Sequence, residues 1–279
     1  MADRFPLVFS TLGCPDWTLE HAAEQAARHG YQALEVRLLD GETIRDDLPA
    51  ARRQEIKAIM ARHGLHIIAL GLSTRFSAAG PAEREANLAQ LCSYLALAND
   101  LEVPMVRTFG GDIQPGCTVD ETVVWVGDSL ARAVPEAERQ GVDIVLETHD
   151  GFCRGAEVAR ALARVPHPRV GAVWDMHHSV RMGEPIEETW RLIGPRVKHV
   201  HIKDARRRPD GSWQLVLLGQ GEMPCRQVVE LLRREGYAGA IAAEWEKKWH
   251  PEIEEPEIAL PQHAEVLRGW FQALPATSI

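Results

Sequence analysis

The chain has 279 residues, 45% of them hydrophobic, and a formal net charge of −9. This length and hydrophobic fraction suit a single α/β barrel with a sizeable core and do not require two domains. The acidic balance argues against nucleic acid as the main partner and disfavours binding to an anionic membrane, because neutralising phosphate groups needs a basic face.

The sequence shows no sign of a signal peptide or of a membrane span. Its beginning lacks a long apolar stretch, and no run approaches the roughly 18 apolar residues that would cross a bilayer. The five cysteines are scattered and odd in number, which indicates free thiols in a reducing compartment. We therefore expect a cytoplasmic protein with no membrane partner.

One sequence pattern recurs along the chain. A helical stretch ends in an arginine, a polar residue and glycine, and a short apolar run follows, at Gly30, Gly64, Gly141 and Gly236. Glycine adopts the left-handed conformation that closes a helix, and a basic residue in the last turn suits the helix dipole. The intervals between these glycines leave room for eight strand–helix units.

The units follow one another in chain order. Strands are expected near residues 6–10, 32–37, 65–70, 104–108, 142–147, 169–174, 197–202 and 239–244. Helices are expected around residues 17–29, 50–63, 81–98, 120–139, 154–164, 185–193, 225–235 and 257–273.

Strands that alternate with helices form a parallel sheet, and eight such units most naturally close into a barrel. The sequence therefore predicts a (β/α)8 TIM barrel that forms a single domain over residues 1–279. A doubly wound open sheet is the alternative. It would need a glycine-rich phosphate loop after an early strand, and residues 10–15 do not form one.

Acidic and histidine residues stand at the ends of four consecutive predicted strands. The fifth strand ends at Glu147 and the sixth is followed by Asp175, while His201 and Glu244 mark the ends of the seventh and eighth. The carboxyl ends of parallel strands meet at one mouth of a barrel, and neighbouring strands lie about 4.8 Å apart, so the four side chains can converge. Burying three carboxylates together is costly without a cation. The sequence therefore predicts that these four residues bind one divalent metal ion.

Two choices within this site stay open. His199 points the same way as His201, and Glu246 the same way as Glu244, because side chains two residues apart on a strand share a face. His201 is preferred since it sits nearer the mouth, and Glu244 since Glu246 begins a polar run. The oxygen-rich donor set favours Mn²⁺ or Mg²⁺, with Co²⁺ or Zn²⁺ as alternatives.

Two motifs give the chain a resemblance to a known family. Residues 174–178 match an Asp-x-x-His pattern, and residues 199–204 match His-x-His-x-Lys-Asp. With the strand-end residues, they resemble the xylose-isomerase-like TIM barrels, the sugar phosphate isomerase/epimerase group, over nearly the whole chain. The resemblance implies the same four metal ligands and substrate contacts from His178 and Arg207. It also implies a small sugar-like substrate and a homodimer or homotetramer.

A site of this kind suits proton transfer next to a carbonyl group. Removing that proton needs a base beside the carbon and positive charge where negative charge develops on oxygen. Glu147 and Glu244 are the predicted catalytic residues, one taking the proton and the other returning it, through a metal-stabilised enediolate, while His178 steadies a substrate oxygen. We therefore expect a metal-dependent sugar isomerase or epimerase. A metal-dependent dehydratase of a cyclic keto-polyol, of the inosose or dehydroshikimate type, is the alternative.

Further residues near the expected mouth allow two interpretations. Arg107 and His66 are predicted substrate contacts, and salt bridges within the barrel wall, with Glu35 and Arg37, are the alternative. Four tryptophans are candidates for an apolar wall against a sugar ring, although at least two of them suit plain packing: Trp17, Trp174, Trp245 and Trp249.

Overall fold

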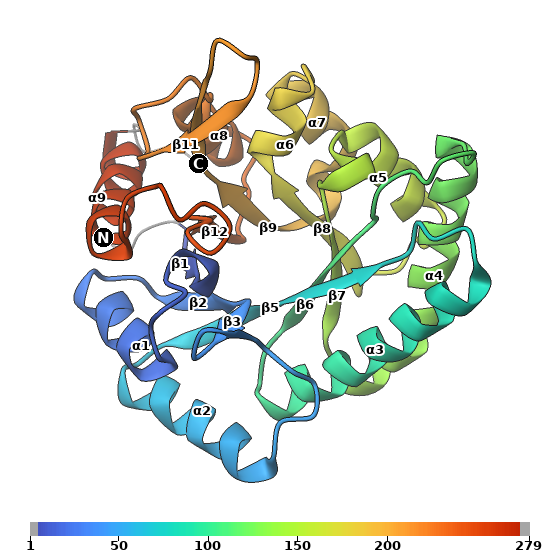
Figure 1. The fold of residues 1–279 in the computed structure, drawn as a ribbon, viewed down its shortest axis with the longest axis horizontal. Coiled ribbons are helices and arrows are strands. Elements are labelled where there is room, and N and C mark those ends of the chain that lie inside the picture. Colours follow the sequence, from blue (N-terminus) through green and yellow to red (C-terminus); the bar gives the residue numbers. More distant parts are fainter. Residues whose placement is uncertain (1–4, 274–279) are drawn as a thin grey trace.

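The structure, a computed structural model, describes residues 5–273. Eight parallel strands close into a barrel in the order β1-β12-β9-β8-β7-β6-β5-β2, and helices surround it (Figure 1). The barrel strands are β1 (Leu7–Ser10), β2 (Ala33–Val36), β5 (His66–Arg75), β6 (Met105–Phe109), β7 (Asp143–Glu147), β8 (Val170–Asp175), β9 (Val197–Ile202) and β12 (Ala240–Ala243). The predicted TIM barrel is therefore confirmed, and each predicted strand is present.

The helices that link the strands match the predicted ones to within a few residues, with one addition. The α-helices are α1 (Leu19–Arg28), α2 (Ala50–Arg62), α3 (Pro81–Asp100), α4 (Val119–Gln140), α5 (Gly155–Ala163), α6 (Met176–Arg181), α7 (Ile186–Ile193), α8 (Cys225–Arg234) and α9 (Pro256–Ala273). Short 3-10 helices are η1 (Thr11–Gly13), η2 (Asp150–Phe152) and η3 (Gly194–Arg196). The sequence does not predict α6, because its 6 residues are too few to show a helical period.

Two small hairpins lie outside the barrel and are not predicted either. One pairs β3 (Leu38–Leu39) with β4 (Glu42–Thr43) after β2. The other pairs β10 (Asp204–Arg207) with β11 (Trp213–Val216) directly after β9. Both follow the carboxyl end of a barrel strand, so they extend the mouth of the barrel.

Local signals in the sequence explain where the helices begin and end. The side chain of Thr118 accepts a hydrogen bond from the backbone of Glu121, and Glu121 bonds back to Thr118, which forms a capping box at the start of α4. The same helix ends at Gly141, whose φ of 69° is left-handed and whose N–H bonds back to carbonyl oxygens of the last turn. The other three glycines of the repeated pattern also have a left-handed φ of 65–72° shortly after a helix ends, as expected: Gly30, Gly64 and Gly236.

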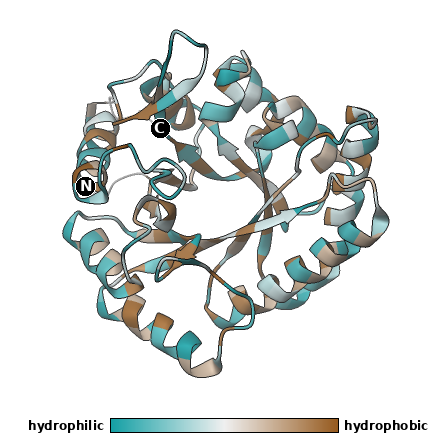
Figure 2. Cartoon of the chain, viewed as in Figure 1, coloured by the Kyte–Doolittle hydropathy of each residue, from teal (hydrophilic) through white to brown (hydrophobic). Residues whose placement is uncertain are grey.

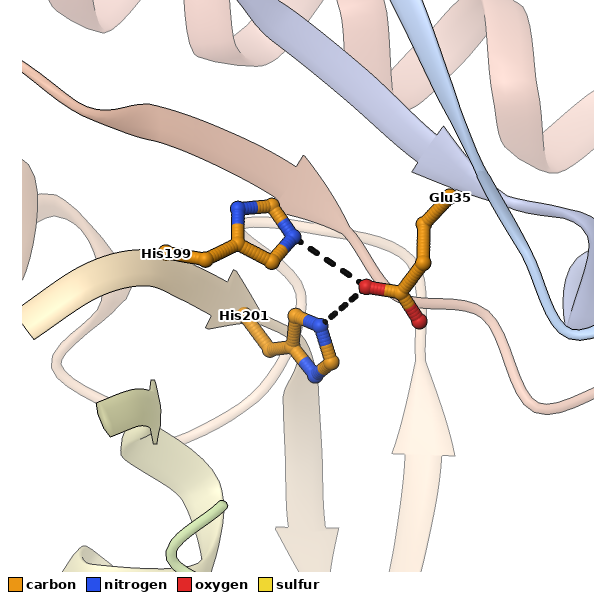
Figure 3. Close-up of side chains that lie close together, drawn as sticks. All are labelled: Glu35, His199 and His201. Carbon is orange, nitrogen blue, oxygen red and sulfur yellow. Dashed lines mark hydrogen bonds and ion pairs between the residues drawn. The ribbon is translucent and has the colours of Figure 1, made fainter. Parts of the chain in front are cut away.

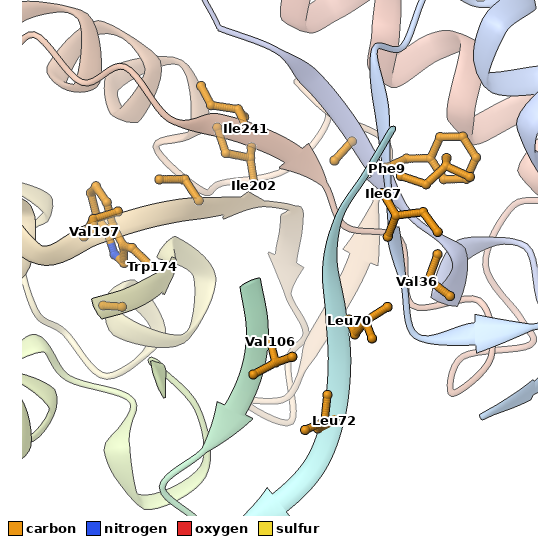
Figure 4. Close-up of a cluster of buried hydrophobic side chains, with 14 of the residues drawn as sticks. Phe9, Val36, Ile67, Leu70, Leu72, Val106, Trp174, Val197, Ile202 and Ile241 are labelled. Carbon is orange, nitrogen blue, oxygen red and sulfur yellow. The ribbon is translucent and has the colours of Figure 1, made fainter. Parts of the chain in front are cut away.

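The main hydrophobic core lies between the barrel and the helices. Side chains such as Phe9, Leu70 and Val106 leave the outer face of the strands and are fully buried (Figure 4). Hydrophilic residues gather on the outer surface of the helical ring (Figure 2). Burial of the strands on both faces is the reason that they read as nearly continuous apolar runs.

The interior of the barrel is apolar at one end and polar at the other. Small apolar clusters, such as Val8 with Ala240 and Ala242, fill the interior nearer the amino ends of the strands. Two residues further along the strands, the inward positions carry ionisable groups, as where Glu147 follows Val145 on β7. Alternation along the strands therefore brings polar side chains to the carboxyl ends, where the mouth of a TIM barrel lies.

We expect the Leu70→Ala variant to lose about 2–5 kcal/mol of unfolding free energy. Leu70 is fully buried on β5, so shortening it leaves a cavity between barrel and helices. Urea denaturation of both proteins measures the difference, and a loss below about 1 kcal/mol would show that this layer is not closely packed.

None of the helices in residues 5–273 combines the length and the apolar character that crossing a membrane requires.

Candidate metal centre

Four buried side chains converge at the carboxyl ends of neighbouring strands. Glu147, Asp175, His201 and Glu244 each place one donor atom so that all four atoms lie within 4.8 Å of one another. Nδ1 of His201 lies 3.5 Å from Oε1 of Glu147 and 3.3 Å from Oε1 of Glu244. The strand register explains the convergence, since Asp175 pairs with His201, and His201 with Ala242, two residues before Glu244.

The donor set fits a divalent cation. Oε2 of Glu147 and Oδ2 of Asp175 are buried and form ion pairs with Arg107 and Lys203. Nδ1 of His201 is also buried, faces the carboxylates of Glu147 and Glu244, and has no hydrogen-bond partner within residues 5–273. A buried polar atom without such a partner is rare and costly, and here it lies among carboxylate oxygens. Three carboxylates and one imidazole match the oxygen-rich shells of Mn²⁺ and Mg²⁺ and also suit Zn²⁺.

His201 is held from its other side by a carboxylate that lies deeper in the barrel. Nε2 of His201 lies 2.7 Å from Oε2 of Glu35, and Nε2 of His199 lies 3.1 Å from the same oxygen (Figure 3). Although burial raises the pKa of Glu35, the two imidazoles hold it well below its usual range. Burial lowers the pKa of His201, but Glu35 and Glu244 outweigh it and hold that pKa well above its usual range.

This arrangement distinguishes the residues that the sequence leaves as alternatives. His199 points inward at the level of Glu35 and is absent from the group of four converging donors. Glu246 lies further out, where it contacts Lys203 and His250. The geometry therefore groups His201 and Glu244, rather than His199 and Glu246, with the other two side chains.

A buried lysine that the site prediction omits lies among the carboxylates. Nζ of Lys203 is 2.7 Å from Oδ2 of Asp175 and 2.6 Å from Oε2 of Glu244, and it also contacts Glu246. Burial raises the pKa of Asp175 to about 7, against the opposing effect of Lys203. Lys203 stands two residues after His201, so the two side chains point the same way along the strand direction. The His-x-His-x-Lys pattern is therefore the sequence signal for Lys203.

A cavity of about 300 Å³ opens over these residues. It is lined by Leu12, Arg37, Ser73, Arg75, Arg107, Phe109, Glu147, His149, Lys203, Glu244, Glu246 and Trp249. This volume is at the lower end of the range for small-molecule sites. The cavity therefore suits a ligand of modest size that reaches Glu147 and Glu244, the two of the four converging side chains that line it.

Arg107, a predicted substrate contact, lies in this cavity and also contacts a predicted metal ligand. Its Nε is 2.9 Å from Oε2 of Glu147, and its guanidinium carbon lies 4.1 Å from the centre of the Phe109 ring. Arg107 thus forms a salt bridge in the barrel wall, as one interpretation of the sequence expects, and lines the cavity, as a substrate contact would. The Glu147 carboxylate is thereby held between Arg107 and His201.

His149, which the prediction does not include, also lines the cavity. Its Nδ1 lies 2.7 Å from Oδ1 of Asp150, and its ring packs against Phe109 and His178. Although burial opposes the change, Asp150 and Glu147 raise the pKa of His149. The short Glu-Thr-His sequence at the end of β7 is the local signal for it, and a residue that follows a strand in this way has no periodic pattern.

His178 lies beside the metal centre rather than in this cavity. Its Nε2 is 3.3 Å from Oδ2 of Asp175 and 3.5 Å from Nζ of Lys203, and burial lowers its pKa well below the usual value. It lines a neighbouring cavity of about 300 Å³ together with His177 and Trp213. Arg207 is exposed on β10 and lines neither cavity, so its contact with substrate stays a prediction.

The prediction that His66 contacts substrate needs correction. His66 is the first residue of β5, is exposed, and lies in a groove with Lys57 and Glu102 at the amino ends of the strands. The strand runs on for 10 residues to Arg75, which lines the cavity at the mouth. Because the mouth lies at the carboxyl ends, His66 is on the opposite side of the barrel from the converging side chains.

The tryptophans divide between packing and the cavity. Trp174 and Trp245 are buried in the hydrophobic core, and Trp17 packs against that core. Trp249 lines the cavity and is 54% exposed. Of the four candidates for an apolar wall, Trp249 is therefore the one placed beside the mouth.

Comparison with known proteins identifies the family. The family model described as xylose isomerase-like TIM barrel matches residues 23–270, and the chain belongs to this family. Fructoselysine 3-epimerase of Escherichia coli O157:H7 is 24% identical over 271 residues, which cover 93% of this chain and 96% of that protein. Inosose isomerase of Halalkalibacterium halodurans is 21% identical over 240 residues, which cover 79% of this chain and 80% of that protein.

Solved structures show the same fold. The IolI protein with a bound zinc atom superposes with a TM-score of 0.82 at 18% identity, over 98% of this chain and 100% of that one. A D-tagatose 3-epimerase-like protein gives a TM-score of 0.77 at 20% identity, over 96% of this chain and 97% of that protein. A probable 3-DHS dehydratase of Bacillus anthracis gives a TM-score of 0.75 at 16% identity, over 94% of this chain and 98% of that protein. The names of these proteins thus refer to a 3-epimerase, an epimerase-like protein, an isomerase and a probable dehydratase.

Proposed function

We propose that this protein is a divalent-metal-dependent epimerase or isomerase that acts on a small ketose-like substrate. The observation that carries the proposal is the convergence of four buried donors, Glu147, Asp175, His201 and Glu244, beneath a cavity at the mouth of the barrel. The names of the relatives support the same substrate class. Mn²⁺ and Mg²⁺ suit the donor set, and the zinc of the IolI structure supports Zn²⁺ as the alternative.

The metal, when bound by these four residues, would supply positive charge to the substrate oxygens on which negative charge develops. The chain supplies the bases. Glu147 and Glu244 come from β7 and the end of β12, which are separated in the barrel by β8 and β9. Their carboxylates therefore approach a bound substrate from different sides. One removes the proton from the carbon beside the carbonyl group, and the other returns a proton to the opposite face, which inverts that carbon.

Two cationic side chains orient these bases. Arg107 holds one oxygen of Glu147 at 2.9 Å, and Lys203 holds one oxygen of Glu244 at 2.6 Å. Each carboxylate is thereby fixed in direction, which is a requirement for proton transfer over a hydrogen-bond distance. Both cations also line the cavity, so they can stabilise negative charge on substrate oxygens.

A dehydratase is the second candidate, and His149 is the observation that favours it. Elimination of water needs a group that protonates the departing hydroxyl as well as a base. His149 lines the cavity next to Glu147, and Asp150 binds its Nδ1, which directs Nε2 away from that carboxylate. An imidazole held in this way is suited to general acid catalysis near neutral pH.

Incubation of the Mn²⁺-loaded protein with D-fructose and other ketoses in D₂O tests the proposal. We expect deuterium to enter at the carbon beside the carbonyl group without loss of water, as read by mass spectrometry, and protein treated with a chelator should show no exchange. A new absorbance from an unsaturated product, formed from an inosose or dehydroshikimate, would instead support the dehydratase. Absence of both reactions with every metal tried would contradict the proposed function.

A further inference from the structure

A fully buried group of three side chains extends from the predicted metal ligand His201 into the barrel and takes no part in the proton transfers described above. Glu35, His199 and His201 are each 0% exposed. One carboxylate oxygen, Oε2 of Glu35, lies 3.1 Å from Nε2 of His199 and 2.7 Å from Nε2 of His201 (Figure 3). A carboxylate removed from water in this way is stable only when donors satisfy it.

The strand order and the small side chains of the intervening strands allow this contact. Glu35 is on β2 and the histidines are on β9, and the strands between them are β1 and β12. The inward side chains of those strands are small at this level: Ser10 pairs with Glu35, and Ala242 pairs with His201. Glu35 can therefore reach across the interior, where Ser10 also donates a hydrogen bond of 3.4 Å to its other carboxylate oxygen.

The two nitrogens of His201 face different partners. Nε2 faces Glu35, whereas Nδ1 faces Oε1 of Glu147 and Oε1 of Glu244. A carboxylate accepts a proton-bearing nitrogen, so Glu35 favours the form of the ring with its proton on Nε2. When a cation takes the place of the proton on Nδ1, the ring keeps its remaining proton on Nε2, toward Glu35.

We propose that Glu35 is a positioning residue, which fixes the ring orientation and tautomer of His201 so that Nδ1 is the metal-binding nitrogen. This inference rests on the proposed metal centre. A carboxylate behind a metal-binding histidine also increases the basicity of the ring, and loss of such a partner typically costs 10- to 100-fold in metal affinity. His199 supports Glu35 by donating to the same oxygen.

A second metal ion held by the same three residues is the competing interpretation, because a carboxylate and two imidazoles can also bind a cation. The contacts argue against it. Both Nε2 atoms are already at hydrogen-bond distance from the single oxygen, and none of the three side chains lines either of the cavities next to the metal centre. The group is therefore a hydrogen-bonded support and not a second metal site.

The Glu35→Gln variant tests the inference through its affinity for Mn²⁺ alone, measured by calorimetry. We expect one Mn²⁺ per wild-type chain and a 10- to 100-fold weaker affinity in the variant. The matched control is Glu184→Gln, since Glu184 is also a buried carboxylate but accepts hydrogen bonds from Gly155 and Thr189. The control should bind Mn²⁺ as the wild type does.

A spectroscopic measurement keeps the test independent of how well the variant folds. In wild-type protein loaded with Mg²⁺ or Zn²⁺, ¹⁵N NMR should show the His201 proton on Nε2. A proton on Nδ1, equal Mn²⁺ affinity in wild type and Glu35→Gln, or a second Mn²⁺ that disappears in the variant would each overturn the inference. A wild-type chain that binds no divalent metal would overturn the proposed function as well.

Discussion

The Glu147→Gln variant is expected to lose turnover by about 10³-fold or more and to bind Mn²⁺ more weakly than the wild type. Glutamine keeps the size of the side chain but removes the base that accepts a proton, an effect worth roughly 10²–10⁴-fold in general base catalysis. It also replaces one of the three carboxylates that converge with His201 at the predicted metal site. Steady-state kinetics and calorimetric Mn²⁺ titration measure the two effects.

The Glu184→Gln variant again serves as the control, because it makes the same chemical change at a buried glutamate that lies outside the site. Circular dichroism should show that both variants keep the fold. Wild-type turnover in Glu147→Gln would rule out Glu147 as a base, and unchanged metal affinity would rule it out as a ligand.

The Lys203→Met variant is expected to destabilise the metal-free protein by about 3–5 kcal/mol, since removal of one partner leaves buried charge without compensation. Lys203 is 2% exposed and contacts the carboxylates of Asp175, Glu244 and Glu246. A divalent cation supplies positive charge at the same place. Mn²⁺ should therefore raise the melting temperature of the variant by more than it raises that of the wild type.

Thermal denaturation with and without Mn²⁺ measures this difference, and Lys247→Met is the matched control. Lys247 is also buried, but its ammonium group bonds to the carbonyl oxygens of Pro251 and Ile253 and to Glu255. Its replacement should lower the melting temperature by an amount that Mn²⁺ does not restore. Equal rescue of both variants would contradict the account of Lys203.

The fold is predictable from the sequence because its signals are local. An arginine, a polar residue and a glycine close a helix by backbone geometry alone, as at Gly141, and the apolar run that follows is a strand buried on both faces. The short α6 and the two hairpins lack a periodic pattern long enough to detect. Their positions depend on how the chain leaves a barrel strand, which is a tertiary property.

The site is predictable where alternation along a strand decides it. Glu147, Asp175, His201 and Glu244 occupy inward positions at the carboxyl ends, and their convergence follows from the closed parallel barrel. The prediction for His66 is wrong for another reason: the strand is expected at residues 65–70 and β5 begins at His66, so this residue stands at the amino end of the strand, whereas the mouth lies at the carboxyl end.

Contacts between distant strands were beyond the reach of the sequence. Glu35 is recognisable as a partner of His201 only when β2 and β9 are seen across the same interior, whereas the His-x-His-x-Lys pattern already marks Lys203. The choice of metal, the contact of Arg207 with substrate, the cytoplasmic location and a homodimer or homotetramer stay predictions.

Anomalous scattering from a crystal soaked with Mn²⁺ tests the central claim most directly. The account predicts one strong peak at the mouth of the barrel, within bonding distance of Glu147, Asp175, Nδ1 of His201 and Glu244. A map with no peak there, and with the four side chains turned to separate partners, would contradict it even if the barrel were as described.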